Sequence, residues 1–135
     1  MPTFEKGQTF LLTKSEKLLK RTKPKYFISL SDADSEDDIV VCFVMNTEHD
    51  FRNLSINCNK RVQKFILSPN IFSFLDRPTA IDLALPQGFT LSELLDNNQI
   101  RLFEIADDVL CRQIKNCIDW NFIAPKFQRL IKDCF

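Results

Sequence analysis

Three early segments decide the expected fold: Lys-Gly-Gln-Thr-Phe-Leu-Leu at residues 6–12, Lys-Pro-Lys-Tyr-Phe-Ile-Ser-Leu-Ser at residues 23–31, and Ile-Val-Val-Cys-Phe-Val-Met-Asn-Thr at residues 39–47. β-Branched and aromatic residues crowd into each run, and turn-forming residues bound it, which is typical of β-strands. The short acidic run at residues 32–38 predicts an exposed turn that joins the second strand to the third as an antiparallel pair. Together the segments predict a small, bent sheet.

Further strands are expected downstream. After a polar loop, a weak strand is expected at residues 54–58 and a better one at residues 62–67. Residues 80–85 alternate between apolar and polar, which indicates a half-buried strand. The Pro-Gln-Gly sequence at residues 86–88 predicts a turn, and residues 100–103 fit either a strand or coil.

Two amphipathic helices are expected over residues 107–118 and 125–134. Asp107 or Asp108 is placed to cap the first, and Pro125 suits the first turn of the second. Both are expected to pack on the sheet through apolar stripes at three- and four-residue spacing. The stripes are Val109, Leu110, Ile114, Cys117 and Ile118 in the first helix, and Phe127, Leu130, Ile131 and Cys134 in the second.

Shorter features complete the expected fold. Residues 13–16, Thr-Lys-Ser-Glu, fit a capping box for a helix that runs to about Arg21. Thr90 or Ser92 is expected to cap another short helix through Leu95. Trp120, between the two last helices, is expected to close the core rather than to anchor an interface.

Composition favours a globular protein. The 135 residues suit one domain, 44% of them are hydrophobic, and the 13 phenylalanines predict a phenylalanine-rich core. No run approaches the roughly 20 apolar residues of a membrane-spanning helix, so a cytoplasmic protein without membrane contact is expected. The five cysteines show no Cys-x-x-Cys pair and are expected to be reduced, buried thiols. His49 is the single histidine, so neither a metal site nor a cofactor is expected.

Positive charge is concentrated in one part of the chain, although the chain as a whole is neutral. The formal net charge is zero, but residues 1–31 hold seven Lys or Arg against two Glu. Such a basic stretch can neutralise the phosphates of a nucleic acid. It is equally typical of a solvated surface, which is the commoner role of a charge run.

The order of motifs resembles the MazF/PemK (Kid) family of bacterial toxins. Lys6-Gly7-Gln8-Thr9 stands where that family has a Lys-Gly-Asp-Ile strand, and Lys23-Pro24 stands where it has an Arg-Pro strand. Asn46-Thr47 takes the place of a Thr-Ser pair at the end of the third strand. Pro78-Thr79-Ala80-Ile81 takes the place of a Pro-Ser-Val strand entry.

The amphipathic stripes predict two C-terminal helices over residues 107–134, and the length of the chain predicts a single α+β domain over residues 1–135. The resemblance implies a small, strongly bent antiparallel β-barrel over residues 1–105 with a C-terminal helix, so the second helix is more than a minimal member of the family needs. It also implies a homodimer, an antitoxin as protein partner, and metal-independent cleavage of single-stranded RNA. In that chemistry a base removes the 2′-hydroxyl proton, and a cation stabilises charge on the phosphate.

Carried over by position, the resemblance gives Lys23 the place of a phosphate-binding arginine and gives Thr47 or Asn46 the polar strand-end role. A lysine cannot make the planar two-pronged contact of a guanidinium, so the resemblance leaves open whether this chain cleaves RNA efficiently. His49 has a pKa suited to proton transfer and is the candidate general base or acid, with a surface histidine as the simpler interpretation.

Candidate RNA contacts besides Lys23 are Lys25, Arg52 and Arg77, each of which is equally consistent with an ordinary surface role. Two rival functions stay open. The same barrel can serve as a non-catalytic module that binds a protein through its rim or its phenylalanine-rich surface. The chain can also be an unrelated α+β domain, since a fold does not determine a function.

Overall fold

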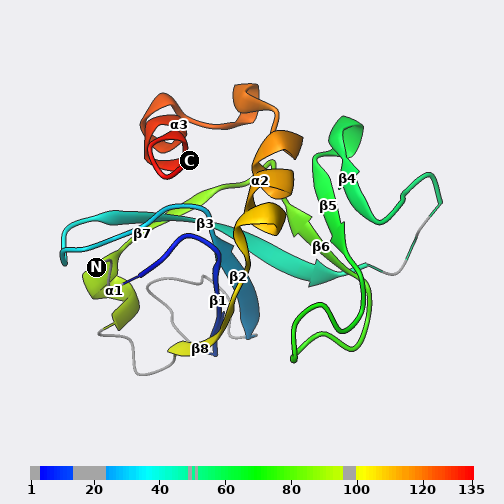
Figure 1. The fold of residues 1–135 in the computed structure, drawn as a ribbon, viewed down its shortest axis with the longest axis horizontal. Helices are drawn as coiled ribbons and strands as arrows, with labels where there is room; N and C mark the ends of the chain where they lie inside the picture. Colours follow the sequence, from blue (N-terminus) through cyan, green and yellow to red (C-terminus); the bar gives the residue numbers. More distant parts are fainter. Residues whose placement is uncertain (1–3, 14–23, 49, 51, 96–99) are drawn as a thin grey trace.

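The computed structural model describes residues 4–13, 24–48, 50, 52–95 and 100–135. Over these residues the chain forms an α+β fold with one antiparallel sheet of eight strands and three α-helices (Figure 1). The strands are β1 (Gln8–Leu12), β2 (Lys25–Ser29), β3 (Ile39–Thr47), β4 (Asn57–Asn59), β5 (Lys64–Leu67), β6 (Thr79–Asp82), β7 (Gln87–Thr90) and β8 (Ile100–Ile105). The helices are α1 (Leu91–Leu95), α2 (Asp108–Cys117) and α3 (Pro125–Lys132).

The strand order is β4-β5-β6-β3-β2-β1-β8. β3 is long enough to pair with two strands on one side, because its first half pairs with β7 and its last three residues pair with β6. β4 and β8 lie at the two ends of this order and do not pair with each other in the described part of the chain. The sheet is therefore open there, and the expected barrel closure is not confirmed.

Both faces of the sheet are covered, which explains why β2 and β3 read as nearly continuous apolar runs. Successive side chains in a strand point to opposite faces. Ile28 belongs to the core under α2 and α3, whereas its neighbour Phe27 belongs to a second core with Phe4, Phe10 and Phe89. Ring contacts link the four phenylalanines of this second core. The expected phenylalanine-rich core is confirmed.

Helices α2 and α3 cover the same face of the sheet (Figure 1). Asp107 caps α2 as expected, accepting a hydrogen bond from the backbone N–H of Leu110 at 2.8 Å. The first stripe is buried except for Val109, which is 66% exposed, so its expected burial is wrong. Val109 lies in the first turn of α2.

The second stripe docks α3 on the sheet. Ile131 is fully buried, and Phe127 and Leu130 pack against the same core. A side-chain carbon at Gly88 would come within 2.7 Å of the Phe127 ring, so glycine lets the ring lie directly on β7. Trp120 also packs against this core, as expected.

Several strand boundaries differ from the expected ones. Residues 60–62 form a short 3₁₀ helix, so β5 begins only at Lys64. The expected turn at residues 86–88 is wrong, because Gln87 and Gly88 pair with Cys42 and Val41 as part of β7. β6 ends at Asp82, short of the expected strand end.

Other expectations hold or fall outside the described residues. The ambiguous segment at residues 100–103 belongs to β8, and Thr90 caps α1 by accepting a hydrogen bond from the Glu93 N–H. The helix expected over residues 14–21 lies outside the described residues. None of the helices described is long and apolar enough to span a membrane.

Candidate functional site

Two of the expected site residues, Lys23 and His49, lie outside the described residues. The predicted convergence of Lys23, His49 and Arg52 therefore stays a prediction. The others, Lys25, Thr47, Arg52 and Arg77, can be placed.

Lys25 and Thr47 lie at the same end of the sheet. The β2–β3 register places Lys25 beside Asn46, and the Lys25 ammonium donates a hydrogen bond to the Asn46 side-chain oxygen at 2.7 Å. Thr47 is exposed at the end of β3, opposite Thr79 of β6. The strand pairing thus brings a cation and two polar strand ends to one end of the sheet.

Arg77 also lies at this end, two residues before β6. Its carbonyl accepts a hydrogen bond from the Thr79 hydroxyl, while its exposed guanidinium forms no ion pair with any residue that the structure describes. Within the described residues, no carboxylate therefore neutralises the positive charge of Arg77 or of Lys25.

Arg52 differs, because it is already paired. Its guanidinium makes two-pronged contact with the Asp50 carboxylate, with a shortest distance of 2.9 Å. This contact lowers the pKa of Asp50, so the carboxylate stays charged and competes with any phosphate for Arg52.

A basic hollow lies next to Arg52 along the chain. It is lined by Asn53, Asn59, Lys60, Arg61 and Val62, and its volume is about 430 Å³. Lys60 and Arg61 are exposed, neither forms an ion pair with a described residue, and no carboxylate lines the hollow. We call this feature the basic hollow. Sequence reasoning missed it, although adjacent Lys and Arg after an asparagine-rich run were a visible signal.

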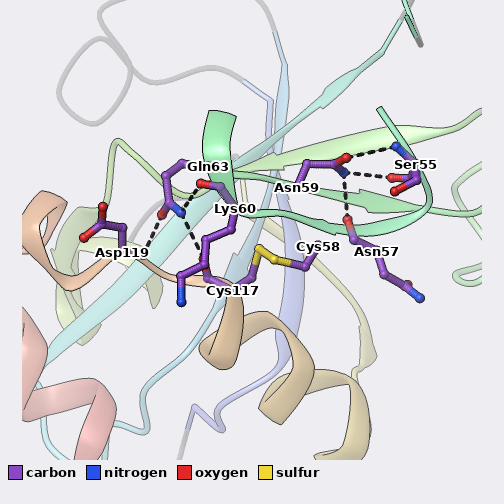
Figure 2. The surroundings of a disulfide bond; sticks show 8 residues. All are labelled: Ser55, Asn57, Cys58, Asn59, Lys60, Gln63, Cys117 and Asp119. Carbon is purple, nitrogen blue, oxygen red and sulfur yellow. Dashed lines mark hydrogen bonds between the residues drawn. A yellow bond between two sulfur atoms is a disulfide. The ribbon is translucent and has the colours of Figure 1, made fainter. Parts of the chain in front are cut away.

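The amide of Asn59 fixes one wall of the basic hollow. It donates to the carbonyls of Ser55 and Asn57 and accepts from the Ser55 N–H at 2.9 Å (Figure 2). These bonds hold residues 55–59 as a compact loop. The lining of the hollow is thereby preorganised.

Gln63 fixes the turn that carries Lys60 and Arg61. Its backbone takes the left-handed conformation with φ 54°, and its side chain is buried. The side-chain amide donates to the carbonyls of Lys60 and Cys117, and its oxygen accepts from the Asp119 N–H at 2.8 Å (Figure 2). The buried amide of Gln63 therefore links the turn that carries Lys60 and Arg61 to the end of α2.

A disulfide strengthens the same link and corrects the expectation of five reduced thiols. Cys58 of β4 is bonded to Cys117 of α2 across a sequence separation of 59 residues (Figure 2). The expectation fails because packing of α2 on β4 brings together two cysteines that no local spacing relates.

The free cysteines do not supply a reactive thiolate. Cys42 and Cys111 are buried, and burial raises the pKa of both thiols, that of Cys111 to about 11. Burial also raises the pKa of Cys134. At neutral pH all three are protonated, which makes them poor nucleophiles and poor metal ligands.

No group of His, Cys, Asp and Glu within the described ranges is arranged to hold a metal ion. Comparison of the chain with protein-family profiles, with curated proteins and with solved structures finds no match. The resemblance to the MazF/PemK family therefore stays a prediction from the motifs quoted above.

Proposed function

We propose that the chain binds single-stranded RNA through its phosphates, with the basic hollow as the main contact. The observation that carries the proposal is a hollow of about 430 Å³ that is lined by Lys60 and Arg61 and by no carboxylate among the residues that the structure describes. An ammonium and a guanidinium side by side offer two charge-assisted contacts to successive phosphates. Asn53 adds an amide that can serve a phosphate or a base.

Lys25 and Arg77 extend this proposal to the end of the sheet. Both are cations without a described carboxylate partner, and they lie by the strand ends that resemble the MazF/PemK pattern. In that interpretation the open sheet is a variant of the bent barrel, and the chain forms homodimers that an antitoxin binds. Cleavage would use His49 as the base, Lys23 on the phosphate and Thr47 at the strand end.

The first experiment measures binding of a labelled single-stranded RNA over a range of salt concentrations. Replacing two phosphate contacts in Lys60→Ala/Arg61→Ala should reduce the slope of log affinity against log salt by about 1.4, since each contact to a single strand contributes about 0.7. The matched control is Lys126→Ala/Arg129→Ala, which removes two exposed cations from α3 and should leave the slope unchanged. Equal slopes in the two double variants would refute the basic hollow as the contact.

A second experiment separates cleavage from binding. Wild-type protein is incubated with a long single-stranded RNA in the presence of a chelator, alongside His49→Ala and Lys23→Ala. Loss of proton transfer in His49→Ala should lower cleavage by about 10²-fold or more with binding retained. Binding without cleavage by the wild type would leave RNA binding in place and remove the nuclease step.

A further inference from the structure

The open edge of the sheet contains a second hollow with a different character. It lies between the two edge strands, with Asn57 of β4 on one side and Glu104 and Ile105 of β8 on the other, and the first turn of α2 forms a further wall. Its volume is about 360 Å³. We call it the seam hollow.

Exposed aliphatic side chains gather at the seam hollow. Ile71, Ile105 and Val109 all line it, and they are 40%, 48% and 66% exposed. They come from three separate elements: the β5–β6 connection, β8 and α2. Scattered single aliphatic residues are normal on a surface, but a convergence of three at one hollow is typical of a binding site.

The strand beside the hollow is also open. β8 pairs with β1 on one side, and no strand pairs with its other side in the part of the chain that the structure describes. The backbone N–H and C=O groups along such an edge can receive one more strand from another chain.

The charge of the hollow selects the occupant. Glu104 and Asp107 line it, and no lysine or arginine in the described part of the chain does. The amide and hydroxyl of Ser73 both donate to the Glu104 carboxylate and lower its pKa, so Glu104 is negatively charged at neutral pH. An apolar site with two carboxylates fits a chain segment that carries both aliphatic and cationic side chains.

We propose that an extended basic segment of a partner protein adds to β8 as a further strand. It places Val, Ile or Leu side chains against Ile71, Ile105 and Val109, and a Lys or Arg beside Glu104 and Asp107. Backbone pairing along the edge supplies affinity, while the hollow and its carboxylates supply specificity. The surface is separate from the basic hollow, and the proposal does not depend on RNA binding.

The test uses the full chain and a synthetic peptide of about eight residues, a usual strand length. The peptide is acetylated and amidated, with Val and Lys alternating, and binding is followed by fluorescence anisotropy and by amide NMR shifts. Three matched peptides replace Lys with Glu, replace Val with Ser, or carry N-methyl groups on alternate backbone nitrogens. Binding of the Val-Lys peptide should be at least about tenfold tighter than that of each matched peptide, and the largest shifts should fall in β8 and the first turn of α2.

Protein variants locate the site. Ile105→Ser and Val109→Ser each remove an exposed aliphatic side chain and should weaken peptide binding about tenfold. Leu85→Ser, which removes an equally exposed aliphatic side chain away from the hollow, should leave binding unchanged. Melting curves of the three variants check that each is folded.

Defined results would overturn the proposal. One is the absence of binding up to about 1 mM peptide, the weak end of specific recognition. Another is equal binding of the N-methylated peptide, which would exclude strand addition. A third is self-association of the peptide-free protein that Ile105→Ser abolishes, because the occupant would then be a second copy of the chain.

Discussion

The basic hollow and the seam hollow share β4 as a wall but differ in charge. Asn59 of β4 lines the first and Asn57 of the same strand lines the second. Among the residues that the structure describes, the basic hollow is lined by two cations, no carboxylate and one exposed aliphatic residue, whereas the seam hollow is lined by two carboxylates, no cation and three exposed aliphatic residues. The formal net charge of the chain is zero. The net charge of the chain thus says little about its partners, because cations and carboxylates gather in two separate hollows beside the same short strand.

The largest effect is expected from breaking the wall that the two hollows share. Cys58, between the two asparagines, is bonded to Cys117. Replacing the pair in Cys58→Ser/Cys117→Ala should lower the free energy of unfolding by about 4 kcal/mol, because a loop of this length is released in the unfolded chain. Urea denaturation measures the loss.

Reduction supplies the control for this prediction. A thiol-free reductant should destabilise the wild-type protein by a similar amount and should leave the double variant unchanged. An equal response of the two proteins to the reductant would show that the bond does not contribute to stability.

The next largest loss of stability is expected at Gln63, which joins the turn carrying Lys60 and Arg61 to the end of α2. In Gln63→Leu, the Cys117 carbonyl and the Asp119 N–H lose the Gln63 side chain as partner, while the Lys60 carbonyl keeps its hydrogen bond from the backbone N–H of residue 63. The free energy of unfolding should fall by about 2–3 kcal/mol. Gln113→Leu, at an exposed position of α2, should change stability by less than about 0.5 kcal/mol. Similar losses in both variants would contradict the role given to Gln63.

A smaller effect is expected from a substitution that makes the basic hollow still more positive than the seam hollow. Asp50→Asn releases Arg52 from its two-pronged ion pair and makes the surroundings of the basic hollow more positive. RNA affinity should rise about two- to fivefold, the range of an exposed ion pair. The slope of log affinity against log salt should steepen by about 0.7. Peptide binding at the seam hollow should not change, and an unchanged salt slope for RNA would show that Arg52 makes no phosphate contact.

The smallest effect concerns the charge of the seam hollow. Ser73 lowers the pKa of Glu104, so Ser73→Ala should raise that pKa toward its ordinary value of 4.5. A lowered pKa favours the folded state above the ordinary value, and this contribution is lost as the pH falls through the lowered pKa. Carbon NMR of the Glu104 carboxyl group measures the shift. If the titration of Glu104 is the same in both proteins, Ser73 does not hold the charge.

Much of the fold could be predicted from the sequence, because local patterns determine it. The apolar runs of β2 and β3, the Asp107 cap and the proline at the start of α3 each carry their own signal. β7 could not be predicted, because the Gln-Gly pair suggests a turn, whereas its pairing with the distant β3 makes it part of a strand. The Cys58–Cys117 bond had no signal either, since chain packing alone relates the two residues.

Less of the candidate site than of the fold could be predicted from the sequence. Lys25, Thr47 and Arg77 were selected by motif position, and the strand register does bring them to one end of the sheet. Lys60 and Arg61 were overlooked because their exposure depends on the 3₁₀ turn that Gln63 ends. The seam hollow depends on two edge strands that are far apart in sequence, and no local pattern predicts such a meeting.

The position of β3 has a consequence for motion. β3 pairs with β2 on one side and with β6 and β7 on the other, so its amides are hydrogen-bonded within the sheet interior. Opening it requires the loss of three strand pairings, and we expect its amide protons to exchange with solvent only when the whole domain unfolds. Within the described residues β4 and β8 each pair with one strand, and the Cys58–Cys117 bond also ties β4 to α2. The amides of β8 should therefore exchange through brief local openings. β8, on its side away from β1, can therefore accept a new neighbour while the centre of the sheet stays closed.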